Sequence, residues 1–259
     1  MQMKLINECF DCIKSQDYQR ALRAGRDAVA KYPNSVGAHR CLGMVYYYLA
    51  RSNPNYFNFS IEELKTAGKL ARFMGNKSDK RDLAATCSEF GDDCKRRGLI
   101  SYALSYYEES RKNHTDLNDM EGKGIDLNNI GEIYEKLGNY DKALEYYNKA
   151  IECFKKAIEI NQENGNYSET AHAMINIALP YTNLKDFSEA ERYLTQGLEM
   201  MKKLGDKCWE ARAYEIFGLL YLAQNQEALA KEYFTKSYNL YESTGSNSEA
   251  QRVYETYLK

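Results

Sequence analysis

A pattern of small and aromatic residues recurs six times along the chain. Its clearest copy places Gly131 at the eighth position of a unit, Tyr134 at the eleventh and Ala143 at the twentieth. The eighth position is small in every unit: Cys9, Gly43, Gly91, Gly131, Ala178 and Gly218. So is the twentieth, with Ala21, Ser60, Ala103, Ala143, Ala190 and Ala230, where residue 60 matches after a five-residue insertion. The units therefore begin near residues 2, 36, 84, 124, 171 and 211.

Small residues at two constant positions predict pairs of antiparallel helices that pack closely. Helix axes approach to about 8 to 10 Å where the contact residues are small. Gly131 on the first helix and Ala143 on the second would mark such a crossing, with Tyr147 filling the space beside it. With 28% charged residues, only three prolines and no strand-rich segment, the composition also favours an all-α fold.

The ends of the helices are marked as well. Five residues are expected to end second helices in the left-handed αL conformation: Gly75, Asn118, Gly165, Gly205 and Gly245. In the fourth unit the tetrapeptide Lys-Ala-Ile-Glu is repeated after seven residues, which is nearly two helical turns, and this predicts one long helix from about 141 to 164. Pro180 lies inside the first helix of the fifth unit and predicts a kink there.

Charge and composition restrict the class of partner and the compartment. The chain has 35 basic and 37 acidic residues, which gives no support to binding of nucleic acid. The beginning of the sequence lacks the apolar run of a signal peptide, and no run of 18 apolar residues predicts a membrane span. Seven scattered cysteines fit a reducing compartment better than a disulfide framework. We therefore expect a cytoplasmic protein without a membrane or nucleic-acid partner.

Residues with catalytic or metal-binding chemistry are sparse. Cys9-x-x-Cys12 is the only CxxC, and both cysteines occupy helix-packing positions, so packing is favoured over redox or metal function. His39 falls at another packing position and is interpreted as a core histidine, whereas His172 opens a first helix and has no catalytic partner in the sequence. No phosphate-binding loop, nucleophile elbow or zinc-protease motif occurs. The sequence predicts a protein that is not an enzyme and has no cofactor or metal.

The segments LNNIG (127–131) and GNYDKAL (138–144) give the pattern a family resemblance. The chain resembles tetratricopeptide repeat proteins over essentially its whole length, and its units of about 40 residues resemble those of kinesin light chains and Pins-type polarity adaptors. The resemblance implies an all-α, right-handed α-solenoid of six helix pairs, a single superhelical domain over residues 1–259 whose first helices line a concave groove. An apolar stripe near the end of the chain predicts a capping helix over residues 247–259.

The resemblance also implies which positions of the first helices line the groove. Applied to this sequence, they give a predicted peptide-binding set: Arg40, Tyr47, Glu89, Asp92, Asn128, Asn129, Glu132, Asn176, Leu179, Ile216 and Leu219. Asparagine offers both a donor and an acceptor to a peptide backbone. The lining changes from polar to apolar along the chain, which predicts an amphipathic protein or peptide partner, polar or basic in its centre and apolar toward one end. The predicted function is that of an adaptor; the alternative is a self-assembling structural scaffold that forms homo-oligomers.

Overall fold

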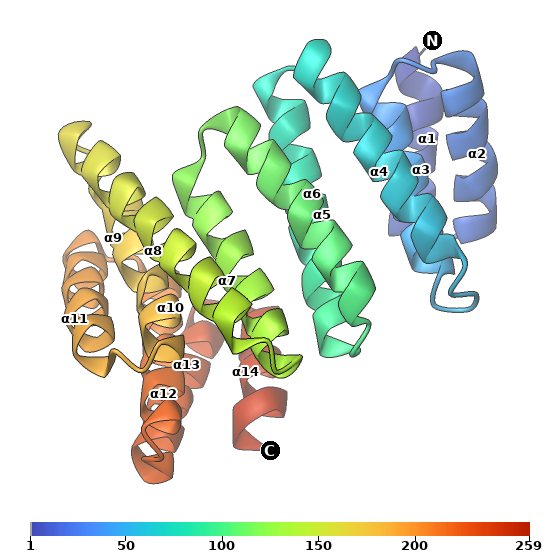
Figure 1. Ribbon diagram of the computed structural model, residues 1–259. Helices are drawn as coiled ribbons and strands as arrows, with labels where there is room; N and C mark the ends of the chain where they lie inside the picture. Colours follow the sequence, from blue (N-terminus) through green and yellow to red (C-terminus); the bar gives the residue numbers. More distant parts are fainter. Residues whose placement is uncertain (1) are drawn as a thin grey trace. The chain divides into compact units, whose positions relative to one another are not determined.

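The computed structural model describes residues 2–259, which divide into two compact units, one up to Asp119 and one over Met120–Lys259 (Figure 1). The first unit contains α1 (Gln2–Lys14), α2 (Tyr18–Lys31), α3 (Val36–Leu49), α4 (Tyr56–Phe73), α5 (Lys77–Arg96) and α6 (Ile100–Leu117). The second contains α7 (Met120–Lys136), α8 (Tyr140–Glu163), α9 (Tyr167–Asn176), α10 (Ala178–Asn183), α11 (Phe187–Leu204), α12 (Lys207–Ala223), α13 (Glu227–Ser243), α14 (Asn247–Val253) and the π-helical turn η1 (Tyr254–Leu258).

Consecutive helices pack as pairs in both units, which confirms the all-α fold of six helix pairs with a terminal cap. In the first unit α1 packs on α2, α3 on α4, and α5 on α6. In the second unit α7 packs on α8, the two segments α9 and α10 pack on α11, and α12 packs on α13. First helices also contact one another, in the rows α1–α3–α5 and α7–α10–α12. Each compact unit thus has a row of adjacent first helices, which we call its inner row. The prediction that all the repeats form one domain stays a prediction, and its first residue, Met1, lies outside the described residues.

The helix crossings are as close as the small residues require. A Cβ atom added to Gly131 would lie 2.6 Å from Tyr147 Cε1, and one added to Gly218 would lie 2.5 Å from Phe234 Cδ1. Real side chains do not approach this closely, so in these two pairs the second helix can reach its position only because the first helix has glycine at the crossing. The close crossing predicted at Gly131 is therefore confirmed, and Ala143 on the second helix is buried.

Most of the predicted helix ends are confirmed. Asn118, Gly165, Gly205 and Gly245 all have positive φ between 55° and 75°. Gly75 does not, and its predicted αL conformation is wrong. A Cβ atom at Gly75 would lie 2.5 Å from Ala71 Cα, so glycine is needed there for close backbone approach. The long helix predicted in the fourth sequence repeat is present as α8, Tyr140–Glu163.

The proline inside a first helix interrupts it as predicted. Pro180 has no N–H to donate to the carbonyl of Asn176, and the helix is divided there into α9, which ends at Asn176, and α10, which begins at Ala178. The first helix of this pair therefore consists of two shorter segments. Both pack against α11.

The predicted capping helix begins at Asn247, as expected, but changes its winding near the end. Val253 of α14 is buried in a cluster with Phe234 and Tyr241 of α13, and the ring of Tyr257 stacks on Phe234 at 4.1 Å between centroids. Tyr254 is 44% exposed, and residues Tyr254–Leu258 form a π-helical turn. Across residues 2–259 the structure has no helix with both the length and the apolar character needed to cross a membrane.

Candidate functional site

The predicted binding residues of the first unit lie on α3 and α5, two neighbouring helices of its inner row. Tyr47 is buried: its hydroxyl donates to the Asp93 carboxylate, and its ring stacks on Phe90 with 3.6 Å between centroids. Burial, together with this hydrogen bond to a carboxylate, raises the pKa of Tyr47 well above its ordinary value. Tyr47 thus joins α3 to α5 in the interior of the unit.

The other three predicted residues of this unit reach the surface. Glu89 is exposed, and Asp92 is partly exposed and accepts a hydrogen bond of 2.5 Å from the hydroxyl of Tyr107. Arg40 Nη2 lies 3.0 Å from Asp82 Oδ2, and its guanidinium stands 5.0 Å from the centroid of the Phe10 ring. Of these three residues, two are carboxylates and the third is an arginine that already has a carboxylate partner.

In the second unit, two predicted asparagines are buried and bonded within the protein. Asn128 donates from Nδ2 to Glu132 Oε1 at 2.9 Å, and its Oδ1 accepts from Asn183 Nδ2 at 3.2 Å. Asn176 donates from Nδ2 to Glu121 Oε1 at 3.0 Å. These bonds link α7 to α9 and to α10. The two side chains therefore hold neighbouring first helices together.

Asn183 and Glu121 belong to this polar network but were not predicted from the sequence. Asn183 stands seven residues after Asn176, on the same face of the helix, and this spacing is a signal that could have identified it. Glu121 gives no such signal, because only the packing of α7 on the fifth helix pair brings the carboxylate of Glu121 to Asn176.

The remaining predicted residues of the second unit are polar on α7 and apolar on α10 and α12. Asn129 and Glu132 on α7, Leu179 on α10 and Leu219 on α12 are partly exposed, whereas Ile216 is fully buried in the core. Leu222, at the end of α12, is 44% exposed and extends the apolar end. Because α10 contacts both α7 and α12, these side chains lie on three adjacent helices. We call Asn129, Glu132, Leu179, Leu219 and Leu222 the α7–α12 surface.

Comparisons with known proteins agree with this architecture. Models of the tetratricopeptide repeat match residues 126–153, 147–203 and 211–244. The chain belongs to the tetratricopeptide repeat superfamily. Two solved structures share the fold: the apo form of RapI, at 15% identity over 99% of this chain and 96% of RapI with a TM-score of 0.50, and BtubC (BKLC) from P. vanneervenii, at 17% identity over 93% and 92% with a TM-score of 0.51. A search of curated protein sequences gave no match.

The two histidines considered from the sequence both have structural partners in the protein. His39 is buried, with Nδ1 2.6 Å from Glu63 Oε2 and Nε2 2.8 Å from the Pro33 carbonyl oxygen. Burial lowers the pKa of His39, but these two hydrogen bonds outweigh it and leave the pKa above its ordinary value. His172 stacks on Trp209 with 3.8 Å between ring centroids, and burial lowers its pKa. His39 is therefore the satisfied core histidine that was predicted.

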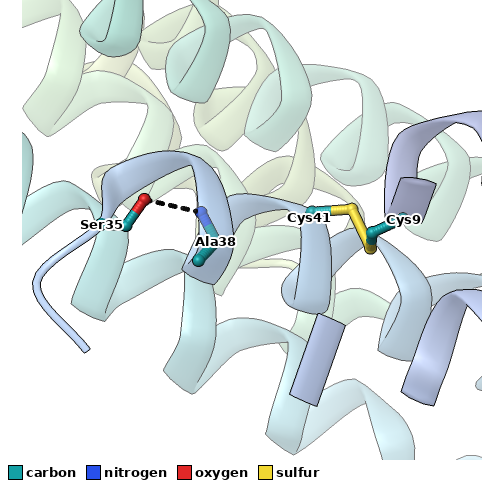
Figure 2. Close-up of a disulfide and its surroundings, with 4 residues drawn as sticks. All are labelled: Cys9, Ser35, Ala38 and Cys41. Atoms are coloured by element: carbon teal, nitrogen blue, oxygen red, sulfur yellow. Dashed lines mark hydrogen bonds between the residues drawn. A yellow bond between two sulfur atoms is a disulfide. The ribbon is translucent and has the colours of Figure 1, made fainter. Parts of the chain in front are cut away.

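The prediction for the cysteines needs a correction. Cys9 and Cys41 form a disulfide between the first helices of the first and second tetratricopeptide repeats (Figure 2). The sequence favoured a packing role for Cys9 because the two residues are 32 positions apart and meet only when the two repeats stack. The other five cysteines, all within the described residues, form no disulfide. Over residues 2–259 no group of three or more His, Cys, Asp or Glu side chains is arranged to hold a metal ion.

Proposed function

We propose that this tetratricopeptide repeat protein is a non-enzymatic adaptor of the cytoplasm that binds a peptide or partner helix on the α7–α12 surface. The observation that carries the proposal is the placement of partly exposed polar side chains on α7 next to partly exposed leucines on α10 and α12. The α7–α12 surface suits an amphipathic ligand. Burial of its leucines stabilises the complex, and its carboxylate selects a basic or polar segment.

In this proposal only the partly exposed residues contact the ligand. Asn128, Asn176 and Ile216 support the surface from below, because their side chains are buried and the two asparagines are bonded within the protein. Asn129 and Glu132 then meet the polar segment of the ligand, and the leucines meet its apolar end. Within the first unit, taken by itself, the carboxylates of Glu89 and Asp92 favour a basic segment.

The first experiment selects ligands and maps them. Peptides selected from a phage-displayed library on the intact chain are measured by isothermal titration calorimetry against the double variant Asn129→Ala/Leu219→Ala. We expect at least a tenfold loss of affinity, since a truncated leucine and a lost amide each remove about 1 kcal/mol or more from a buried contact.

The matched control changes the same residue types on α8, which is the second helix of its pair. Leu144→Ala/Asn148→Ala alters an exposed leucine and an exposed asparagine of α8. This pair should leave the affinity unchanged. If it weakens binding while the α7–α12 pair does not, the ligand binds the outer helices and the proposal is wrong.

The alternative function, a scaffold that assembles with its own copies, is separated by mass in solution. Sedimentation velocity at several concentrations should give a monomer whose mass does not change if the adaptor proposal holds. Discrete homo-oligomers that dissociate in the Asn129→Ala/Leu219→Ala variant would instead assign the α7–α12 surface to self-assembly.

A further inference from the structure

The disulfide lies where the first helix pair meets the second. Cys9 of α1 and Cys41 of α3 are both fully buried, and their Cα atoms are 6.4 Å apart. The start of α3 is held by Ser35, whose Oγ accepts a hydrogen bond of 3.3 Å from the N–H of Ala38 (Figure 2). Cys41 therefore stands on a helix with a well-defined beginning, and the bond attaches α1 directly to it.

A third helix encloses the bond. A Cβ atom added to Gly25 of α2 would lie only 3.3 Å from Cys9 Sγ. The sulfur atoms are thus surrounded by α1, α2 and α3 and are out of contact with solvent. A thiol reagent can reach them only when the first helix pair opens, so the chemistry of the bond and the order of this pair are coupled.

Cys12 brings a third sulfur to the same region. It lies one helical turn after Cys9 and lines a cavity of about 790 Å³ on the surface of α1, together with Lys4, Glu8 and Arg20. Of the three cysteines only Cys12 lines this cavity, so a small thiol or disulfide can approach α1 here and meets the bonded pair when the first helix pair opens. Cys12 also offers Cys9 an alternative partner on the same helix.

The cysteines of the chain are not those of a disulfide-stabilised framework. One pair is bonded and the other five cysteines form no disulfide. In a reducing compartment such as the proposed cytoplasm, a disulfide is usually transient and catalytic or redox-sensing. We propose that Cys9–Cys41 is a redox-controlled pin: when formed it holds the pair α1–α2 to α3, and when reduced it lets this pair open while the rest of the first unit stays folded.

The exchange partner is a low-molecular-weight thiol and its disulfide, of the glutathione class. In the oxidising direction one cysteine thiolate attacks the small disulfide, forms a mixed disulfide and releases one small thiolate. The second cysteine thiolate then attacks the protein sulfur of the mixed disulfide, forms Cys9–Cys41 and releases the second small thiolate. Two electrons pass to the small disulfide, and the two cysteine protons end on the two released thiols. Reduction consumes two small thiols and reverses both steps.

The pin acts next to the inner row of the first unit. Phe10 and Arg40, the neighbours of the two cysteines in the sequence, form a cation–π contact between α1 and α3 with 5.0 Å from the guanidinium to the ring centroid. Opening of α1 separates them and changes the surroundings of Arg40. Any effect on ligand binding rests on the proposed function, whereas the pin itself does not.

The experiment compares the intact chain in oxidised and reduced glutathione buffers. Alkylation in denaturant followed by mass spectrometry should count five thiols after oxidation and seven after reduction, with peptide mapping showing the Cys9–Cys41 linkage. Hydrogen exchange should become faster in α1 and α2 on reduction, on the order of 100-fold, as expected for a cross-link that closes a loop of this length. The amides of α5 and α6 should exchange at the same rate in both buffers.

Two variants complete the test. Cys41→Ser should give the fast exchange of α1 and α2 in both buffers, and Cys87→Ser, which removes a buried thiol of α5, should keep the dependence on redox state. Seven thiols after oxidation, or a mapped Cys9–Cys12 linkage, would overturn the proposal. So would five thiols with the correct linkage but equal exchange rates in the two buffers. These readouts involve no ligand, so they remain valid if the adaptor proposal fails.

Discussion

A buried carboxylate adds to the apolar contacts that attach the capping helix to the last repeat. Glu215 of α12 accepts two hydrogen bonds from Arg252 of α14, at 2.7 and 2.8 Å, and a third from Arg212 at 3.0 Å. The side chain of Glu215 is only 2% exposed, whereas those of Arg252 and Arg212 are 38% and 32% exposed. Replacing Glu215 by Gln keeps the shape of the side chain but leaves two arginines facing a neutral amide.

The expected cost follows from this geometry. Removing one partner of a buried ion pair typically costs about 3 to 5 kcal/mol, because the other charge stays buried without a partner. Here both arginine side chains keep about a third of their surface in water, which reduces the penalty. We expect the free energy of unfolding to fall by about 2 to 3 kcal/mol, and Tm by roughly 6 to 12 °C for a unit of this size.

The assay combines thermal unfolding with hydrogen exchange, because repeats contact mainly their neighbours and the loss should be local. In Glu215→Gln, exchange should accelerate in α14 and η1 and remain unchanged in α7. The matched control is Glu189→Gln, since Glu189 accepts two bonds from Arg192 at 3.0 and 2.6 Å with both side chains largely exposed. That change should cost less than about 1 kcal/mol.

The same carboxylate predicts a dependence on pH. Burial acts to raise the pKa of Glu215, but attraction to Arg212 and the hydrogen bonds from Arg252 outweigh it and hold the pKa below its ordinary value. A lowered folded pKa means that the contribution is present above the unfolded pKa, near 4.3, and is lost as pH falls through the folded pKa. A Glu215→Gln variant as stable as the parent at pH 7, or one no more damaging than Glu189→Gln, would refute the reasoning.

Three further changes test other parts of the structure. The folded pKa of His39 is raised, in part by its hydrogen bond to Glu63, so the protonated imidazole stabilises the fold fully below about pH 6.5. This stabilisation is lost as pH rises through the folded pKa. Urea midpoints at pH 5.5 and 8.5 should therefore differ in the parent and converge in His39→Gln. Gly218→Ala places a methyl group 2.5 Å from the Phe234 ring and should lower the free energy of unfolding by about 1 to 3 kcal/mol in urea, whereas an unchanged midpoint would mean that the two helices separate freely. Lys185 has a φ of 62°, in the left-handed region that strains a non-glycine residue. Lys185→Gly removes this strain and should raise the free energy of unfolding by about 1 kcal/mol. A loss of stability would show that the lysine side chain has a compensating contact.

The helix pairs could be predicted because the signals for them are local. A glycine at a crossing, a glycine or asparagine after a helix and a proline within one act on residues within a few turns, and Gly131, Gly165 and Pro180 acted as predicted. Gly75 shows the limit of such reasoning. The same residue type serves either a positive φ or a close backbone approach, and the sequence does not distinguish them.

The candidate site was less accessible to sequence reasoning. Family positions predicted that Asn128 and Asn176 face a ligand, but both are buried and bonded to Asn183 and Glu121 of neighbouring first helices. Whether an asparagine faces solvent or the adjacent helix depends on a rotation of a few tens of degrees about the helix axis. That rotation is set by the packing of one repeat on the next.

The sequence by itself determined the number of helix pairs, the positions where they cross and most of the residues that end them, since each depends on contacts inside one repeat. The tertiary structure alone decided which polar side chains are buried, which remain on the α7–α12 surface, and that Cys9 meets Cys41 across 32 residues. These outcomes depend on contacts between repeats, where residues distant in the chain become neighbours only after each helix pair has packed against the next.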